Sequence, residues 1–262
     1  MSSQMKAQLP ELTQIAKKRL RTLMKKRLAD LSGETIQEQS MSLFRRLQAF
    51  EPYIQAKRIA VYLSMPTGEL QTDAIVRDAF QAGKQVFVPY MLKNKARPYY
   101  EQENQAEDGT FRAVMDMVQL HSHADYESLK RDRWGIPTIG DDTIDQREHI
   151  IKNAKANSAG LDLILLPGVA FDVEPQSGTI RRLGHGRGYY DYFLGHYHHL
   201  REYFGQQNPL LYGLALQEQV LHPLSSPSST EEVPVGPFDR PLHGLLVGNG
   251  EIIESRARQP QT

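Results

Sequence analysis

The segment 161–166 constrains the fold of this chain more than any other, because it reads Leu-Asp-Leu-Ile-Leu-Leu and is nearly all apolar. A continuous apolar run is typical of a strand that is buried on both faces, as in a parallel sheet that helices cover on both sides. The run ends at Pro167 and Gly168, a pair that turns the chain. We therefore expect a central parallel strand at this point of an α/β fold.

An earlier βαβ unit supports a mostly parallel sheet. Residues 58–63 are rich in β-branched and aromatic side chains and predict a strand, residues 73–81 predict a helix that Gly83 ends, and residues 85–89 predict the next strand. Parallel neighbours need a crossover connection of about this length. The predicted fold is a three-layer α/β/α arrangement, in which helices cover both faces of a mostly parallel sheet.

The rest of the chain fits one domain. Apolar residues recur at spacings of three and four from Leu12 to Leu31 and predict a first helix. The further expected elements are helices over 34–49 and 187–204 and strands over 111–120, 210–216 and 242–247. Loops are expected over 93–110, 173–181 and 225–237. We assign residues 11–250 to a single domain, residues 1–10 to a flexible N-terminus and residues 251–262 to a flexible tail.

Composition excludes several classes of function. Lys+Arg and Asp+Glu both number 31, so no net charge draws the chain to nucleic acid or to an anionic membrane. The chain has no cysteine, which excludes disulfides, thiolate nucleophiles and Cys-ligated metal centres. The longest apolar run is too short to span a bilayer, and the N-terminus lacks the apolar core of a signal peptide. We expect a cytoplasmic monomer without a nucleic-acid or membrane partner, and mitochondrial import stays open.

The chemistry is expected at residues 182–191, which read Arg-Leu-Gly-His-Gly-Arg-Gly-Tyr-Tyr-Asp. The three alternating glycines let the backbone approach an anion and turn its N–H groups toward it, and the helix that follows adds its dipole. Arg182, His185 and Arg187 supply cationic donors, and Asp191 is placed to hold a divalent metal against a bound polyphosphate. The alternative is a tight turn followed by a helix-capping acid, because glycine spacing alone has little specificity.

Two motifs together resemble a known family. Leu-Pro-Gly-Val-Ala-Phe-Asp at 166–172, followed by the glycine-rich segment, resembles the signature of the 5-formyltetrahydrofolate cyclo-ligases, also called 5,10-methenyltetrahydrofolate synthetases. The agreement runs in order from about Lys17 to about Val247. The resemblance implies a fold like that of NagB, RpiA and the CoA transferases. It also implies that ATP and Mg²⁺ are used to cyclise 5-formyltetrahydrofolate, with or without a polyglutamate chain, to 5,10-methenyltetrahydrofolate.

The resemblance assigns an ATP site. A Lys-x-x-Leu-Arg motif on the family's first helix is matched at 17–21, where Lys17 and Arg21 lie one turn apart and can meet a phosphate together. Without that match, a solvated basic face would be the simpler interpretation. The implied ATP-binding residues are Lys17, Arg21, Arg182, Leu183, Gly184, His185, Gly186, Arg187, Gly188, Tyr189 and Tyr190. Arg187 and Tyr189 are the implied catalytic residues.

The resemblance also assigns a folate site and a metal site. Glu69 matches a family glutamate that accepts two N–H bonds from the pterin, although the loop before it is one residue longer here. The alternative is an ordinary exposed acid before a helix. The implied substrate-binding residues are Leu63, Glu69, Met115, Trp134, His185, Gly186, Arg187, Gly188 and Tyr189. The implied metal ligands are Asp191 and Asp239, and Asp239 is the looser match because Phe238 and His243 replace the usual histidine and aspartate.

Two other classes of function compete with this hypothesis. A sugar-phosphate isomerase or CoA transferase on a similar sheet would need no ATP, and residues 182–191 carry no adjacent acid pair to move protons. An RNA-binding module would use the basic helix at 17–27, but the net charge is zero and no basic sheet with interleaved aromatics is predicted. For Trp134, the alternative to a folate contact is a core position, where a lone Trp is most often found.

Overall fold

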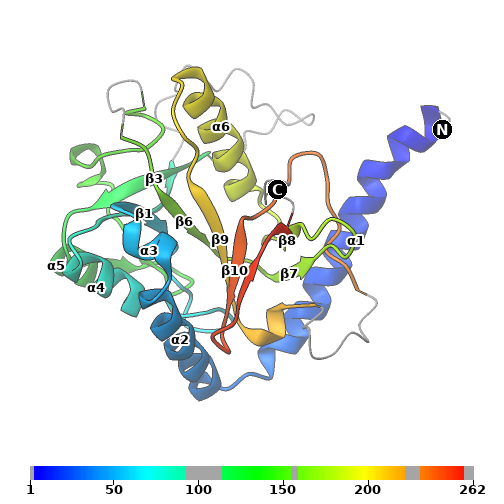
Figure 1. Ribbon diagram of the computed structural model, residues 1–262, viewed down its shortest axis with the longest axis horizontal. Coiled ribbons are helices and arrows are strands. Elements are labelled where there is room, and N and C mark those ends of the chain that lie inside the picture. The colour runs from blue at the N-terminus through cyan, green and yellow to red at the C-terminus, as the bar shows by residue number, and fades with distance from the viewer. Residues whose placement is uncertain (1–2, 93–113, 155–158, 222–230, 257–262) are drawn as a thin grey trace.

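The computed structural model describes residues 3–92, 114–154, 159–221 and 231–256. Within these ranges the centre of the molecule is a seven-stranded sheet in the order β11-β10-β9-β6-β1-β2-β3 (Figure 1). Its strands are β1 (Arg58–Val61), β2 (Gln85–Leu92), β3 (Val114–Leu120), β6 (Leu163–Leu166), β9 (Leu210–Ala215), β10 (Gly244–Val247) and β11 (Ile252–Glu254). Neighbours from β10 to β2 are parallel, whereas β3 and β11 pair antiparallel at the two edges. The predicted, mostly parallel sheet is confirmed.

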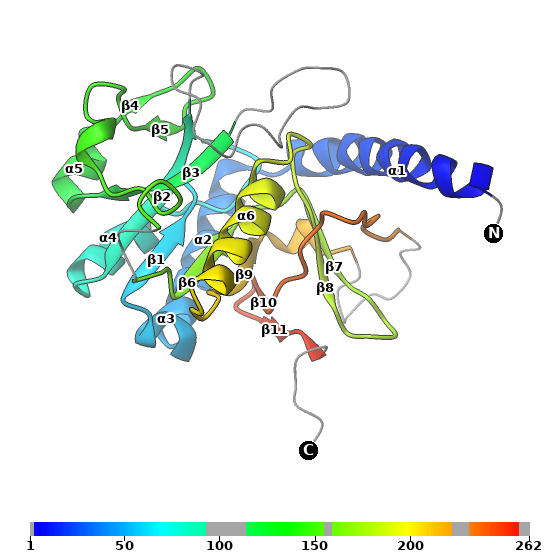
Figure 2. The ribbon, with the colours of Figure 1, turned by 90° about the horizontal axis from the view of Figure 1, so that it is seen from above.

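The larger helices are α1 (Ser3–Ala29), α2 (Gly33–Gln48), α4 (Asp73–Gln81) and α6 (Tyr189–Tyr203). The other helical elements of the described residues are two short helices, α3 (Glu51–Gln55) and α5 (His123–Glu127), and 3₁₀ turns at Ile144–Gln146 and Gln217–Gln219. Two small antiparallel pairs lie outside the main sheet, β4 (Lys130–Arg131) with β5 (Pro137–Thr138) and β7 (Ala170–Val173) with β8 (Ile180–Leu183). Figures 1 and 2 show that the N-terminal end of α1 extends beyond the rest of the molecule.

The central strand β6 shows how the sheet divides the core into two layers. Leu163 and Leu165 belong to a cluster with residues of α2, α3 and α4. Ile164 and Leu166 belong to a second cluster with Phe193 of α6. Successive side chains of a strand point to opposite faces, so an all-apolar strand requires a helical layer on each side. This arrangement confirms the predicted three-layer α/β/α fold.

The β7–β8 hairpin attaches α1 to this body. Leu20 and Met24 of α1 are buried with Ala170 of β7 and Leu183 of β8 in a third cluster. We predicted a loop over 173–181, but only its middle is a turn, because Ala170 pairs with Leu183 and Val173 pairs with Ile180. The strands on either side are only four residues long, and strands this short carry little periodicity for a sequence to reveal.

Both predicted flexible ends contain regular structure. Residues 3–10, which we assigned to a flexible N-terminus, form the start of α1, and the helix continues through Pro10, although proline is disfavoured inside helices. Residues 252–254, which we assigned to the tail, form the edge strand β11 against β10. An edge strand is paired on one side only, so its sequence need not be apolar throughout.

Other predicted boundaries move by a few residues. The helix expected over 187–204 begins at Tyr189, because Gly186 and Gly188 have positive φ angles that a helix does not accept. Of the strand expected over 111–120, the part from Val114 onward is described and paired. The expected loop at 93–110 lies outside the described residues, and so does much of that at 225–237.

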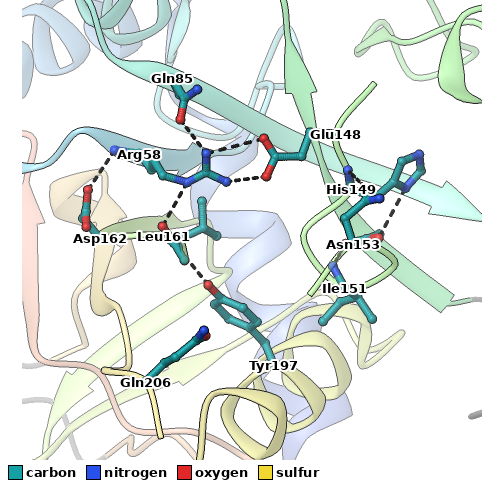
Figure 3. A network of polar contacts seen from close by, with 12 residues as sticks. Arg58, Gln85, Glu148, His149, Ile151, Asn153, Leu161, Asp162, Tyr197 and Gln206 are labelled. Atoms are coloured by element: carbon teal, nitrogen blue, oxygen red, sulfur yellow. Dashed lines mark hydrogen bonds and ion pairs between the residues drawn. The ribbon is translucent and has the colours of Figure 1, made fainter. Parts of the chain in front are cut away.

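A buried polar network ties together the amino ends of three parallel strands (Figure 3). The Arg58 guanidinium at the start of β1 donates to Glu148 Oε1 at 2.6 Å and to the carbonyl oxygen of Gly160 at 3.0 Å. It also donates to Gln85 at the start of β2, and the backbone N–H of Arg58 donates to Asp162 just before β6. These contacts fix the amino edge of the sheet and leave the carboxyl edge for the functional side chains.

Candidate active site

The predicted site residues gather at the carboxyl edge of the parallel strands, where ligands bind in open α/β sheets. Glu69 lies in the segment that follows β1, and Pro167 and Gly168 follow β6. The glycine-rich segment follows β8 and leads into α6. The parallel pairing of β1 with β6 therefore brings two loops about a hundred residues apart in the chain to one edge of the sheet.

The glycine-rich segment has the backbone conformation that its sequence requires. Gly186 has a φ of 100° and Gly188 has a φ of 72°, a region in which residues with a Cβ are strained. Gly188 caps α6, and Tyr189 is the first helical residue. The N–H groups of the first turn of α6 and the positive end of its dipole are therefore directed at the segment, as an anion site requires.

Two cations reach this segment from α1. The Arg21 Nε donates to the carbonyl oxygen of Gly184 at 2.8 Å, and a Cβ on Gly186 would lie 3.0 Å from the Arg21 Cζ. Lys17, one turn earlier, forms an ion pair of 2.5 Å with Asp239, which also accepts the backbone N–H of Gly236 at 2.6 Å. The structure thus places both predicted α1 cations at the motif, and Lys17 is buried although it carries a charge.

Arg182 and Asp191 form a second ion pair beside the glycine-rich segment. The Arg182 Nη2 donates to Asp191 Oδ1 at 2.7 Å, and its Nη1 donates to the carbonyl oxygen of Pro167 at 3.2 Å. Asp191 and Asp239 both act on Arg21, since each raises the pKa of that guanidinium, although burial is the larger effect and lowers it overall. The two predicted metal ligands therefore both lie near the Arg21 guanidinium.

This donor set fits a magnesium nucleotide. Mg²⁺ is bound in proteins by one or two carboxylates together with substrate phosphates and water, rather than by an all-protein cage. In the part of the chain that the structure describes, no group of three or more His, Asp or Glu side chains is placed to hold a metal. Asp191 and Asp239 would hold Mg²⁺ only in company with phosphate oxygens, which Lys17, Arg21 and Arg182 are placed to neutralise.

The remaining motif residues differ in their exposure to solvent. His185 and Arg187 are exposed, and Tyr189 is partly buried against the second cluster. Desolvation of the ring, together with the charges of Arg182 and Arg21, lowers the pKa of His185. This shift disfavours the charged form of the ring in the ligand-free protein. The role of His185 as a cationic donor to phosphate stays a prediction.

Glu69 is the least expected of these groups, because it is only 5% exposed and forms no ion pair among the described residues. One of its oxygens accepts the backbone N–H of Met65, which holds the side chain inward. Burial raises the pKa of Glu69 to about 7, and the Met65 bond only partly offsets this effect. The interpretation of Glu69 as an ordinary exposed acid is therefore wrong.

The other predicted folate contacts differ in their exposure to solvent. Leu63 and Met115 are buried in the core, so their contact with a ligand stays a prediction. Trp134 is 57% exposed and lies under the guanidinium of Arg133 at 3.9 Å. The turn that carries Trp134 touches the Glu69 loop, because a Cβ on Gly135 would lie 2.6 Å from the Pro66 Cγ. Trp134 is thus not a core residue, and it lies where an aromatic ring can stack on it.

Two features of the site were not predicted from the sequence. Leu183, a predicted ATP contact, has its side chain in the third cluster, and its carbonyl oxygen accepts the N–H of Val169 at 2.7 Å. The pairing of Lys17 with Asp239 joins residues 222 positions apart, and no local pattern signals a contact of that range. Lys17 and Asp239 had each been predicted as site residues, but separately, by the match of each to a family motif.

Known proteins resemble this chain over most of its length. Residues 13–247 match the 5-formyltetrahydrofolate cyclo-ligase family. The chain belongs to this family. A probable 5-formyltetrahydrofolate cyclo-ligase of Caenorhabditis elegans is 34% identical over 78% of this chain and 84% of its own length. The 5-formyltetrahydrofolate cyclo-ligase of Saccharomyces cerevisiae is 30% identical over 90% of this chain and 97% of its own length.

A solved structure supports the fold of this cyclo-ligase family member. The 5,10-methenyltetrahydrofolate synthetase of Aquifex aeolicus superposes with a TM-score of 0.58 at 23% identity, over 94% of this chain and 95% of that one. No helix in the described ranges is both long and apolar enough to cross a membrane.

Proposed function

We propose that this protein catalyses the ATP- and Mg²⁺-dependent cyclisation of 5-formyltetrahydrofolate to 5,10-methenyltetrahydrofolate. Family membership supports the reaction. The observation that carries the proposal is the position of a cationic cluster, formed by Lys17, Arg21 and Arg182 around a glycine-rich helix start, near the buried carboxyl group of Glu69. One end of this site suits a polyphosphate and the other suits the N–H edge of a pterin.

The reaction needs activation because the formyl group on N5 is an amide, and oxide cannot leave it at neutral pH. The formyl oxygen attacks the γ-phosphorus of ATP, and ADP leaves. The formyl carbon is then bonded to a phosphate leaving group. N10 attacks this carbon and loses its proton, inorganic phosphate departs with the former formyl oxygen, and the five-membered ring closes.

The protein contributes position and charge to these steps, as in other phosphoryl transfers. Lys17, Arg21 and Arg182 neutralise nucleotide phosphates, and the exposed Arg187 is placed on the segment that meets the transferred group. Asp191 and Asp239 would hold Mg²⁺ together with phosphate oxygens, and the ion would supply further neutralisation of charge. Tyr189, at the first position of α6, lines the junction between nucleotide and folate. Glu69 holds the pterin, and Trp134 stacks on it.

The decisive test is an absorbance assay for methenyltetrahydrofolate in the near ultraviolet. Purified protein is mixed with Mg²⁺ and 5-formyltetrahydrofolate, with and without ATP. We expect absorbance to grow only when ATP is present, with one ADP formed per product. Folded protein that binds ATP but gives a flat trace would overturn the folate assignment while leaving the nucleotide site intact.

We also propose a cytoplasmic monomer that accepts polyglutamylated folate. Light scattering during size-exclusion chromatography tests the first part. Comparison of the KM for mono- and polyglutamylated 5-formyltetrahydrofolate tests the second.

A further inference from the structure

Tyr190, the second residue of α6, carries a buried polar group that has no hydrogen-bond partner in the described part of the chain. Its hydroxyl is sealed from solvent and forms no hydrogen bond with the described residues. The Nε of Arg182 is likewise buried and unpartnered, although the other nitrogens of that guanidinium are bonded. The Arg182 Cζ lies 5.5 Å from the centre of the Tyr190 ring, so the two unpaired donors belong to neighbouring side chains.

An unpaired buried donor needs a physical explanation, because its desolvation is normally offset by a bond. Most of the Tyr190 side chain is explained by packing, since its ring contacts both layers of the core. A phenylalanine would pack there equally well and would leave no hydroxyl unpaired. The hydroxyl is therefore available to donate a hydrogen bond to a ligand.

The surroundings indicate what the hydroxyl binds. Glu69 is close enough to act electrostatically on Tyr190, and the ring packs against the cluster that contains Tyr62, Leu63 and Leu70, which flank Glu69 in the chain. Tyr62 is not a competitor for this role, because its own hydroxyl already donates to the carbonyl oxygen of Leu70 at 3.0 Å. The Glu69 carboxyl group and the unused Tyr190 hydroxyl therefore offer an acceptor and a donor near each other.

This combination matches one edge of a pterin. The ring carries two N–H donors, on N3 and on the 2-amino group, next to the acceptor oxygen on C4. We propose that the Tyr190 hydroxyl donates to the C4 oxygen of the pterin while Glu69 accepts the two N–H groups. Tyr190 is then a specificity-determining residue of the folate side of the site, whereas the family resemblance placed it with ATP. This inference rests on the proposed function. Since the hydroxyl is sealed in the ligand-free protein, binding must displace the atoms that now cover it.

The test is Tyr190→Phe, with Tyr203→Phe as the matched control. Tyr203 is on the same helix but is 83% exposed, so its hydroxyl lies outside the site. For Tyr190→Phe we expect the KM for 5-formyltetrahydrofolate, and its Kd measured by calorimetry without ATP, to rise about tenfold, which is the loss of one hydrogen bond. The KM for ATP should stay within twofold of wild type. Tyr203→Phe should change none of these values.

Stability separates this role from a structural one. Removal of an unpaired buried hydroxyl should leave the Tm of the ligand-free protein unchanged or raise it. A lower Tm with an unchanged folate Kd would show that the hydroxyl is satisfied internally, for example by a buried water, and would overturn the inference. A rise in the KM for ATP alone would overturn it in favour of a nucleotide contact.

The controls distinguish this inference from the proposed function. If wild-type protein turns over 5-formyltetrahydrofolate but Tyr190→Phe binds it equally well, only the role of Tyr190 fails. If wild-type protein neither binds nor converts 5-formyltetrahydrofolate, both fail together.

Discussion

Lys17 and Asp239 form an ion pair of 2.5 Å across a separation of 222 residues, and both side chains are largely buried. The pair joins α1 to the segment before β10 at the edge of the glycine-rich motif. A lysine that is already paired with one carboxylate can exchange or share that partner when a phosphate arrives. In the proposed reaction, the pair would hold a cation in place for the nucleotide before it binds.

Lys17→Ala tests this role. We expect the KM for ATP to rise at least about tenfold, because a buried charge-assisted contact to phosphate is lost. The KM for 5-formyltetrahydrofolate should change little. Lys18→Ala is the matched control, since Lys18 is adjacent but exposed, and it should behave like wild type. Equal effects of the two substitutions on the KM for ATP would contradict a specific role for Lys17.

Asp191→Asn tests whether Asp191 is a metal ligand or only the ion-pair partner of Arg182. The asparagine oxygen can still accept from Arg182, so the ion-pair geometry is largely kept while the negative charge is lost. We expect kcat to fall about a hundredfold or more, as for other losses of charge stabilisation in a transition state. The loss should be partly recovered at high Mg²⁺ concentration. Full turnover by Asp191→Asn at ordinary Mg²⁺ concentration would refute the metal role.

Glu69 should make folate binding depend on pH. Its pKa of about 7 means that the carboxyl group is protonated below neutral pH and then cannot accept two N–H groups. We expect kcat/KM for 5-formyltetrahydrofolate to fall as the pH decreases below 7. Glu69→Gln should lower it roughly ten- to hundredfold at pH 8, because a bond to a charged acceptor is lost. A pH profile of Glu69→Gln identical in shape to that of wild type would contradict this assignment.

The Glu69 carboxyl group should also make the free energy of unfolding depend on pH, with the opposite sign to its effect on folate binding. The folded protein holds the Glu69 proton more tightly than the unfolded chain does, so the free energy of unfolding decreases as pH rises from 4.5 to about 7. The decrease is on the order of 3 kcal/mol. Glu69→Gln should therefore unfold at higher urea concentration than wild type at pH 8 and at a similar concentration at pH 4.5. A destabilised Glu69→Gln at pH 8 would show that the bond from Met65 to the carboxylate outweighs the cost of burying its charge.

Gly186 and Gly188 allow backbone strain to be separated from contact with Arg21. Both have positive φ, so alanine at either position should lower the free energy of unfolding by about 1–2 kcal/mol. A Cβ on Gly188 meets open space, whereas one on Gly186 lies 3.0 Å from the Arg21 Cζ and displaces the guanidinium. We expect Gly186→Ala to raise the KM for ATP clearly more than Gly188→Ala does. The reverse order would show that Arg21 is not held at this segment.

The Arg58–Glu148 network should matter for stability alone. Glu148→Gln leaves the Arg58 charge with a weaker partner and should cost about 2 kcal/mol of unfolding free energy. The network (Figure 3) lies at the amino edge of the sheet. The site lies at the carboxyl edge, so both KM values should be unchanged. Lys152→Gln is the control, because the Lys152–Asp145 pair is exposed and contributes little.

Much of the fold follows from local pattern. The apolar run at 161–166 predicted a central parallel strand, and β6 is that strand, paired with β1 on one side and β9 on the other. The β7–β8 hairpin and the edge strand β11 were not predicted. They are three or four residues long, and the tertiary pairing that stabilises them has no period within so short a segment.

The sequence by itself determined the parts of the site that are contiguous in the chain. Alternating glycines before a helix dictate the backbone conformation at 184–188, because only glycine accepts the positive φ angles there without strain. The motif match likewise identified the cations of α1 and both aspartates as separate members of a site.

Only the tertiary structure decided how these members meet. It paired Lys17 with Asp239 and Arg182 with Asp191, and it buried Glu69 deeply enough to raise its pKa. It also left the Tyr190 hydroxyl without a partner among the described residues. Pairing, desolvation and unsatisfied donors depend on atoms from segments far apart in the chain, so they arise only when the sheet brings those segments to one edge.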